Sequence, residues 1–540
     1  MPRLRNLPAI LCCAALAALT GCSGGSSFEG GNILHVNLGA EVQDLDPDLV
    51  TGVPEHRALS SLFEGLTDLD PATMQPVPAV AKSWDISEDA TRYTFHLRDD
   101  AKWSNGDPVT AKDFAYGWQR ILTPSLAAEY AYMLYCIKNA KPFNEGKITE
   151  FSEVGVKVID DHTLEVTLES PTPYFLSLHY HQSYFPIHQA TVEKFGGMAE
   201  RGNRWTRTGN HVGNGAFRLV EWRPDEYIRV EKNPYYWDAA SVRLDGIEFT
   251  PISDVLTEER NFRAGKTQIT ETIPLQKIEV YREENPEELM VNPYLGVYFY
   301  RINVTRPPLN DVRVRLALSK ALDRERLAAD VLKAGEQPAY NLTPPDTAGY
   351  TSSAKMDYNP EEAKRLLAEA GFPDGKGFPK IELLYNTSEQ HKTIAEAVQQ
   401  MWKNTLNVEI GLYNQDWKVY LDSTDTLNYD LARAAWIGDV VDPMNFLEMF
   451  TSYGGNNRTG YDSEVYDQLI EQAYATPEQG PRYEIMRRAE AQLLEDAPII
   501  PVYFYTTKYL KAEEVKGFIP NILDYRRWKD LWLDTSGSGV

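Results

Sequence analysis

The order strand, helix, strand between residues 381 and 412 constrains the fold more than any other feature of this chain. Residues 381–385 and 408–412 have the apolar content and the alternation of short strands. Between them, apolar residues recur at i, i+4, i+7 and i+8, the spacing of one helix face, at Ile394, Val398, Met401 and Trp402. Two strands joined by a crossover helix pair in parallel, so the pattern predicts an α/β sheet.

A further strand is predicted near residues 429–436, and Ile437, Gly438 and Asp439 follow it. In open α/β sheets, ligands bind beyond the carboxyl ends of the strands. Because Asp439 stands at such an end, the pattern places its carboxylate in a predicted cleft.

Strand and helix signals alternate along the rest of the chain, which favours an α/β class throughout. Residues 93–97 alternate as a strand, and Thr110 with Asp113 has the spacing of a capping box. Asn310 and Asn359 are each predicted to open a helix. Since 540 residues exceed one ordinary hydrophobic core, we expect two or three domains.

The net charge of −24 argues against a nucleic-acid partner, which would require clustered Lys and Arg. The motifs G-x-S-x-G, G-x-x-x-x-G-K-[ST] and H-E-x-x-H are absent from the sequence, so no catalytic residue is predicted. His179 and His181 could share a strand face near His188, but no carboxylate or cysteine accompanies them at metal-ligand spacing. We therefore expect neither a metal nor a cofactor.

The first residues have the pattern of a processing signal. Arg3 and Arg5 precede an apolar run, residues 7–19, that is too short for a stable membrane span. The run ends in Leu-Thr-Gly-Cys22, which resembles the lipobox of bacterial lipoproteins. We predict a signal peptide over residues 1–21, lipidation of Cys22 and a flexible tether over residues 22–31.

The expected location is therefore the periplasm or cell envelope, with a lipid anchor to the membrane. Of the four cysteines, only Cys136 would remain besides the anchor, so no internal disulfide is expected. Cys136 is predicted to be a buried core residue rather than a nucleophile.

Several blocks of sequence together resemble one protein family. They are AKSW (81–84), YTFHLR (93–98), KWSNG (102–106), PVTAKDF (108–114), NGAF (214–217), NPYYWD (233–238), DVRVR (311–315), ALDR (321–324) and AGF (370–372). In this order they resemble the signature of the family 5 extracytoplasmic solute-binding proteins. The resemblance implies an α/β, periplasmic-binding-protein-like fold of type II, with two lobes, an additional third domain and a ligand cleft between the lobes.

The layout of that family implies domain boundaries for this chain. Lobe I would be discontinuous and would consist of residues 32–63, 186–295 and 507–540. Residues 64–185 would form the extra domain II, and residues 296–506 would form lobe III.

Within the family, residues 384–388 with His391, and residues 432–436 with Asp439, are most similar to oligopeptide-binding members. The resemblance implies a receptor, not an enzyme, that captures oligopeptides and delivers them to the permease of an ABC transporter, working as a monomer. It assigns the peptide ammonium group to Asp439, the residue that the sheet pattern also selects. The other ligand-binding residues that it implies are Trp436, Trp417, Arg433, His391 and Tyr294.

Alternatives remain for four of these side chains. Trp436 could belong to a core, Arg433 could form a structural ion pair, and His391 could be a surface residue at a helix start. Asp439 could be a turn residue at the end of a strand. The alternatives for the whole chain are an exported hydrolase acting on peptides or glycans, a structural envelope lipoprotein, and a same-fold receptor for another solute. That solute could be a murein peptide, a dipeptide, a nickel chelate or haem.

Departures from the oligopeptide-binding pattern bear on specificity. Thr51 replaces a Glu on the ligand side, Thr424 replaces a basic residue and Ser319 replaces a Lys, so carboxylate capture could differ. Gly296 and Ile437 stand where some members carry two paired cysteines.

Overall fold

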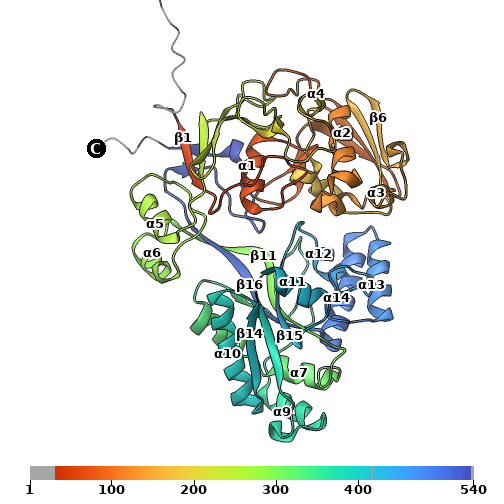
Figure 1. Ribbon diagram of the computed structural model, residues 1–540, viewed down its shortest axis with the longest axis vertical. Helices are drawn as coiled ribbons and strands as arrows, with labels where there is room; N and C mark the ends of the chain where they lie inside the picture. Colours follow the sequence, from red (N-terminus) through yellow and green to blue (C-terminus); the bar gives the residue numbers. More distant parts are fainter. Residues whose placement is uncertain (1–30, 416, 535, 537–540) are drawn as a thin grey trace, which may run out of the picture.

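The computed structural model describes residues 31–415, 417–534 and 536, and these form two halves joined by long strands (Figure 1). The predicted signal peptide, Cys22 and the tether up to residue 30 lie outside the described residues. In the described part of the chain, every helix is too short or too polar to cross a membrane.

The upper half contains two four-stranded sheets. The first has the order β1-β10-β9-β8, in which β1 (Ile33–Asn37) and β10 (Gly246–Thr250) are parallel, while β9 (Tyr227–Lys232) and β8 (Phe217–Arg223) are antiparallel. The second is antiparallel, with β4 (Ala81–Ile86), β5 (Arg92–Leu97), β7 (Thr163–Thr167) and β6 (Val156–Asp160) in that order. A short hairpin of β2 (Thr67–Leu69) and β3 (Pro76–Pro78) leads into the second sheet.

The upper half also contains helices. They are α1 (Val53–Leu62), α2 (Ala111–Leu122), α3 (Ala140–Asn144), α4 (Gln189–Lys194), α5 (Val255–Arg263) and α6 (Ile278–Glu284). The predicted capping box of α2 is confirmed, because the Thr110 amide donates to the Asp113 carboxylate at 2.7 Å. The prediction that His179 and His181 share a strand is wrong: His179 lies in a 3₁₀ turn, Phe175–Tyr180, and His181 directly follows it.

The lower half is built on one six-stranded sheet with the order β12-β16-β11-β15-β13-β14. Its strands are β11 (Leu289–Ile302), β12 (Gln337–Pro338), β13 (Ile381–Asn386), β14 (Ile410–Gln415), β15 (Leu431–Ile437) and β16 (Ile499–Leu510). The predicted crossover is confirmed, since β13 pairs in parallel with both β14 and β15 and α10 (Glu389–Leu406) joins β13 to β14. Strand β14 begins two residues later than the sequence pattern suggested.

Helices pack on both sides of this sheet. They are α7 (Val312–Lys320), α8 (Arg324–Arg326), α9 (Pro360–Glu369), α10, α11 (Trp417–Asp425), α12 (Met444–Leu447), α13 (Glu464–Tyr474) and α14 (Gln479–Asp496). Asn359 caps α9 as predicted, with its side chain accepting from the Glu362 amide. The cap of α7 was predicted one residue too early: the Asp311 carboxylate, not Asn310, accepts from the first turn.

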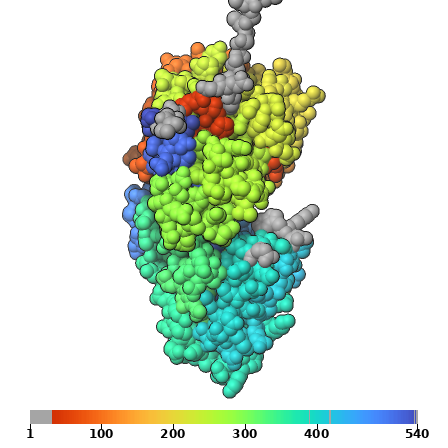
Figure 2. All heavy atoms as spheres, turned by 90° about the vertical axis from the view of Figure 1, so that its left-hand side faces the viewer, coloured from red at the N-terminus to blue at the C-terminus, as the bar shows by residue number. Residues whose placement is uncertain are grey.

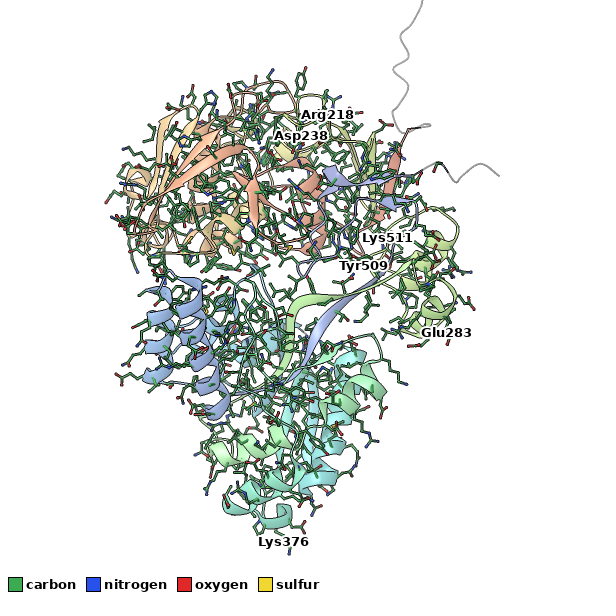
Figure 3. All side chains as sticks on the ribbon, turned by 180° about the vertical axis from the view of Figure 1, so that it is seen from behind. Arg218, Asp238, Glu283, Lys376, Tyr509 and Lys511 are labelled. Carbon is green, nitrogen blue, oxygen red and sulfur yellow. The ribbon has the colours of Figure 1, made fainter. Side chains whose placement is uncertain are left out.

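Strands β11 and β16 run from one half into the other, side by side (Figure 1). Their pairing is interrupted between Pro293 and Val297, close to the predicted boundary at residue 295. Seen from behind, Tyr509 and Lys511 lie where β16 reaches the upper half (Figure 3). There the Leu510 carbonyl accepts from the Thr270 amide at 2.9 Å.

A view from the side shows the segment that contains α5 and α6 lying over the junction of the halves (Figure 2). A small C-terminal hairpin of β17 (Val515–Lys516) and β18 (Trp532–Leu533) returns the chain to the upper half. The fold is therefore α/β with two lobes, as predicted. The domain boundaries inferred from sequence stay a prediction.

Candidate functional site

The loop after β15 carries Asp439 to the edge of the lower sheet. Gly438 is buried, and a Cβ atom at this position would overlap the side chain of Leu295, so the close approach requires glycine. The Asn445 side chain fixes the loop: its Oδ1 atom accepts from the Asp439 amide at 3.1 Å and from Trp436 Nε1 at 3.0 Å. Asp439 thus stands beyond the carboxyl end of a strand, where the sequence pattern placed it.

Two tyrosines from the upper half meet Asp439. Tyr132 donates its hydroxyl to the Asp439 carboxylate at 3.4 Å, and Tyr180 donates to the Asp439 carbonyl at 3.1 Å. No Lys, Arg or His of the described chain lies within ion-pair distance of this carboxylate. Burial raises the pKa of Asp439 to about 6, although the hydrogen bond from Tyr132 acts in the opposite direction.

Asp439 lines a cavity of about 110 Å³ between the two halves. The upper half supplies most of its wall, including Thr51, His56, Arg57, Tyr130, Tyr180, His181, Asp524 and Arg526. The two histidine rings stack with centroids 5.6 Å apart, and burial lowers the pKa of His56 to about 4. The cavity therefore combines neutral aromatic walls with a few buried charges.

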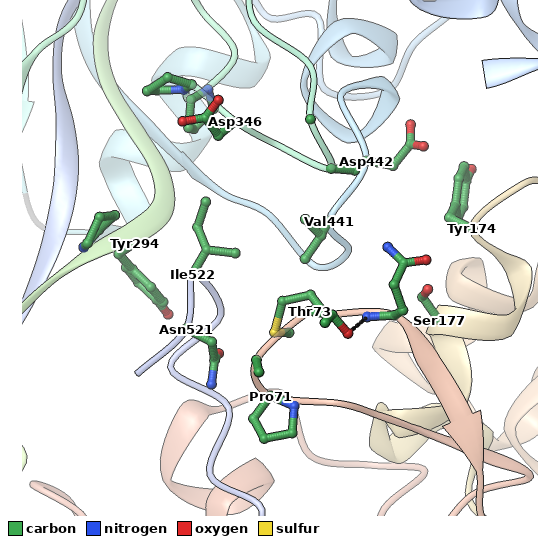
Figure 4. A pocket seen from close by; sticks show the side chains of 18 of the residues that line it. Pro71, Thr73, Tyr174, Ser177, Tyr294, Asp346, Val441, Asp442, Asn521 and Ile522 are labelled. Carbon is green, nitrogen blue, oxygen red and sulfur yellow. Dashed lines mark hydrogen bonds between the residues drawn. The ribbon is translucent and has the colours of Figure 1, made fainter. Parts of the chain in front are cut away.

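A larger cavity of about 740 Å³ lies beside it, also between the halves. Tyr294 from the interrupted part of β11 lines both cavities. Figure 4 shows Tyr294 at one side of the larger cavity and Tyr174 at the other, with Val441 and Ile522 between them. Both halves contribute to this lining, so the space would change when the halves move.

Arg433 and His391 form a separate polar group in the lower half. Arg433 donates to the Tyr505 hydroxyl at 3.0 Å and to Asn386 Oδ1 at 3.3 Å, and its guanidinium lies 4.9 Å from the centre of the Tyr298 ring. The structural ion pair considered for Arg433 does not occur within the described ranges. Tyr505 also lines the larger cavity, so Arg433 lies directly behind its wall.

His391 stands in the first turn of α10, with its ring 5.6 Å from the Tyr298 ring. It is half-buried rather than a free surface residue. Burial, and secondarily the positive charge of Arg433, lowers the pKa of His391 to about 4. A neutral imidazole can both donate and accept a hydrogen bond.

Comparison with known proteins identifies the family. The model of the bacterial extracellular solute-binding proteins, family 5, matches residues 75–458. The chain belongs to this family. The periplasmic oligopeptide-binding protein OppA of Escherichia coli K12 is 41% identical over 497 residues, which cover 89% of each chain.

Solved structures of family members superpose on the whole fold. The murein tripeptide binding protein MppA of Escherichia coli gives a TM-score of 0.79 at 37% identity, covering 93% of this chain and 99% of MppA. Haemophilus influenzae OppA in complex with RPPGFSPFR gives a TM-score of 0.75 at 35% identity, covering 93% and 99%. The family is one of solute-binding proteins, and this establishes the two-lobed fold with its third domain.

The ligand-binding roles of the two tryptophans stay predictions. Trp436 packs against the core of the lower half while its indole holds Asn445, so it supports the loop from behind. Trp417 is the first residue of α11, and its side chain lies outside what the structure describes.

Two of the departures that were expected to affect specificity do not reach the cavities. Thr424 is fully buried and donates to the Leu421 carbonyl, and Ser319 is fully buried and accepts from Arg324 at 2.9 Å. The side chains of Thr424 and Ser319 therefore line neither described cavity. The inference that carboxylate capture differs, drawn from the loss of basic side chains at these positions, stays a prediction. Thr51, in contrast, is exposed and lines the smaller cavity.

Gly296 and Ile437 are direct partners across β11 and β15. A Cβ atom at position 296 would overlap the tip of the Ile437 side chain. The Ile437 side chain therefore occupies the space that a side chain at position 296 would need.

Sequence reasoning missed the residues that the upper half brings to Asp439, among them Tyr130, Tyr132, Tyr180, His56 and Arg526. They come from distant parts of the chain, so no local pattern could connect them with Asp439. The single available signal was the pair of tyrosines at positions 130 and 132, in a segment without other strand or helix character.

Proposed function

We propose that this protein is the peptide-binding receptor of an ABC importer, which captures oligopeptides between its lobes and delivers them to a membrane permease. The observation that carries the proposal is the Asp439 carboxylate, which lies in an interlobe cavity and forms no ion pair with any described Lys, Arg or His. A buried carboxylate of this kind is stabilised when a ligand supplies the positive charge. The similarity to an oligopeptide-binding protein and a murein peptide-binding protein supports the same function.

The peptide ammonium group would bind Asp439, and such a charge-assisted hydrogen bond contributes roughly 1.5–3 kcal/mol. The hydroxyls of Tyr130, Tyr132 and Tyr180 surround this position. The rest of the peptide would pass Tyr294 into the larger cavity, where bridging waters tolerate varied side chains.

The opposite end of a short peptide would lie near Tyr505, behind which Arg433 and His391 stand. Arg433 supplies a positive charge that has no carboxylate partner among the described residues, which suits a peptide carboxylate. Trp417 would form part of the cleft wall. Trp436 would act indirectly, by holding the Asn445 side chain that fixes the Asp439 loop.

For ligand capture, lobe I (residues 32–63, 186–295 and 507–540) and domain II (residues 64–185) would move as a unit against lobe III (residues 296–506). The interrupted pairing of β11 and β16 gives this motion a place to bend. Contacts from Tyr132 and Tyr180 to Asp439 join the lobes, so a ligand at Asp439 touches both sides of the closure.

We further propose that the mature protein is anchored in the cell envelope through lipidated Cys22 and works as a monomer beside the permease. The signal-like residues 1–21 and the Leu-Thr-Gly-Cys motif support this proposal. Mass spectrometry of the membrane-extracted protein would find a diacylglycerol-modified Cys22, and an unprocessed N-terminus would contradict it.

Isothermal titration of Ala-Ala-Ala and N-acetyl-Ala-Ala-Ala tests the role of Asp439. Asp439→Ala should weaken binding of the free-amine peptide by about tenfold to a hundredfold and leave the acetylated peptide almost unaffected. Asp100→Ala, which removes an exposed carboxylate outside both cavities, is the matched control and should bind both peptides normally. Equal losses for both peptides would refute the ammonium role.

Peptide recovered from the protein after these titrations distinguishes a receptor from an exported hydrolase. A receptor releases its peptide unchanged on denaturation, whereas a hydrolase yields free amino acids or shorter peptides. Chromatography of the released ligand reads out the difference.

A further inference from the structure

The guanidinium of Arg526 is an unusual part of the Asp439 cavity. Arg526 is 2% exposed, yet it lines the cavity together with Asp439 and Thr51. Its Nε and Nη1 atoms are buried and have no hydrogen-bond partner among the described residues. Since a buried charged donor without a partner is costly, an acceptor is expected to enter the cavity.

The neighbours of Arg526 do not supply that acceptor. Its Nη2 atom donates to Asp524 Oδ2 at 3.3 Å, but Arg57 donates to the same oxygen at the shorter distance of 2.6 Å. Arg57 also pairs with Glu271, so Arg57 is the better satisfied of the two guanidiniums. On its other side, Arg526 lies 4.9 Å from the centre of the Tyr509 ring, which accepts no conventional hydrogen bond at its face.

The remaining lining groups are also poor partners. His56 and His181 are neutral because burial lowers the pKa of both rings, so they neither compete as cations nor neutralise a carboxylate. Asp439 comes from the opposite lobe and is the position for a ligand ammonium under the proposed function. The cavity is therefore bipolar: lobe III contributes a carboxylate that pairs with no described cation, and lobe I contributes the guanidinium of Arg526, which keeps two nitrogens unpaired among the described residues.

We propose that Arg526 binds the side-chain carboxylate of a peptide whose N-terminal residue is Glu or Asp. This inference rests on the proposed function, because Asp439 must hold the ammonium group of the same residue. An N-terminal acidic residue carries both charges within one residue, which matches a cavity of about 110 Å³ with both complementary groups on its wall. A carboxylate bound to a guanidinium forms stronger, shorter hydrogen bonds than a neutral amide does, so Glu is favoured over Gln.

Titration calorimetry with Glu-Ala-Ala, Gln-Ala-Ala and Ala-Ala-Ala tests the inference. The wild-type protein should bind Glu-Ala-Ala about tenfold more tightly than Gln-Ala-Ala, as one charged hydrogen bond predicts. Arg526→Gln should reduce this ratio to less than about twofold while it keeps Ala-Ala-Ala binding. Arg260→Gln, on exposed helix α5, is the matched control and should keep the full ratio.

If Arg526→Gln does not fold, Thr51→Glu replaces it, with Thr51→Gln as its control. Thr51 is exposed and lines the same cavity, so a carboxylate there repels an acidic ligand side chain without disturbing the buried arginines. Glu-Ala-Ala should then lose more affinity than Gln-Ala-Ala, and only in Thr51→Glu.

The outcomes separate the two proposals. Wild-type protein that binds all three tripeptides equally, or an Arg526→Gln variant that keeps the preference for Glu-Ala-Ala, overturns the Arg526 subsite alone. Wild-type protein that binds none of the three refutes the proposed function and the subsite with it.

Discussion

Two carboxylates three residues apart in the same loop have opposite surroundings. Asp442 is 4% exposed and makes two hydrogen bonds of 2.7 Å with Arg482, which is buried on α14. Asp439 meets tyrosine hydroxyls and an interlobe cavity but no described cation. The difference teaches that the Asp442 carboxylate stabilises the fold of lobe III, whereas the Asp439 carboxylate is available to a ligand.

The largest expected effect is on the free energy of unfolding, when the ion pair between Asp442 and Arg482 is removed. Asp442→Ala leaves Arg482 buried without its carboxylate, and the loss of one partner from a buried pair costs about 3–5 kcal/mol in unfolding free energy. Urea unfolding followed by circular dichroism measures it, with Asp346→Asn as a control on the same cavity lining. A loss below about 1 kcal/mol would contradict a structural role for the pair.

The next effect concerns ligand affinity and pH. Because burial raises the pKa of Asp439 to about 6, the empty site takes up a proton as the pH falls through that value. A ligand ammonium requires the ionised carboxylate, so the association constant should fall by up to about tenfold per pH unit below about 6. Titrations of Ala-Ala-Ala from pH 8 to pH 4.5 measure it, and a profile that is flat across pH 6 would argue against the role of Asp439.

Substitution of Asp439 is expected to stabilise the empty protein, whereas substitution of Asp442 is expected to destabilise it. A raised pKa means that the folded state holds the Asp439 proton more tightly than the unfolded state does, so stability is lost as the pH rises from the ordinary value of 3.8 to about 6 and stays lost above it. Asp439→Asn should therefore raise the Tm of the empty protein at pH 7.5 and raise it by a smaller amount at pH 5. Thermal scans at both values test the sign, and a lower Tm at pH 7.5 would show a hidden partner for Asp439.

The smallest expected effect is a shift in the pKa of Asp439 when its hydrogen bond from Tyr132 is removed. Tyr132→Phe removes the 3.4 Å hydrogen bond that lowers the pKa of this carboxylate, so its pKa should rise above that of the wild type. The pH midpoint of peptide binding should then move upward, with an affinity change at pH 8 of about 0.5–1.5 kcal/mol at most. Tyr453→Phe, on an exposed tyrosine, should leave the midpoint unchanged.

Much of this arrangement follows from local sequence. The i, i+4, i+7, i+8 spacing in residues 394–402 and the two alternating segments beside it are enough to predict a parallel crossover, and hence Asp439 at a strand end. The caps at Thr110 and Asn359 are also readable, because a cap depends on residues within one turn. The cap of α7 was misplaced because Asn310 and Asp311 are adjacent and equally suited, so that only the geometry separates them.

What the sequence determined by itself was the α/β class, the family and the position of one carboxylate, since these depend on short periodicities and ordered motifs. Only the tertiary structure decided which carboxylate is paired, that Thr424 and Ser319 are buried, and that Arg526 shares a cavity with Asp439. The physical reason is that burial and charge compensation depend on groups hundreds of residues apart, such as Tyr132 and Asp439, which meet only when the two lobes face each other.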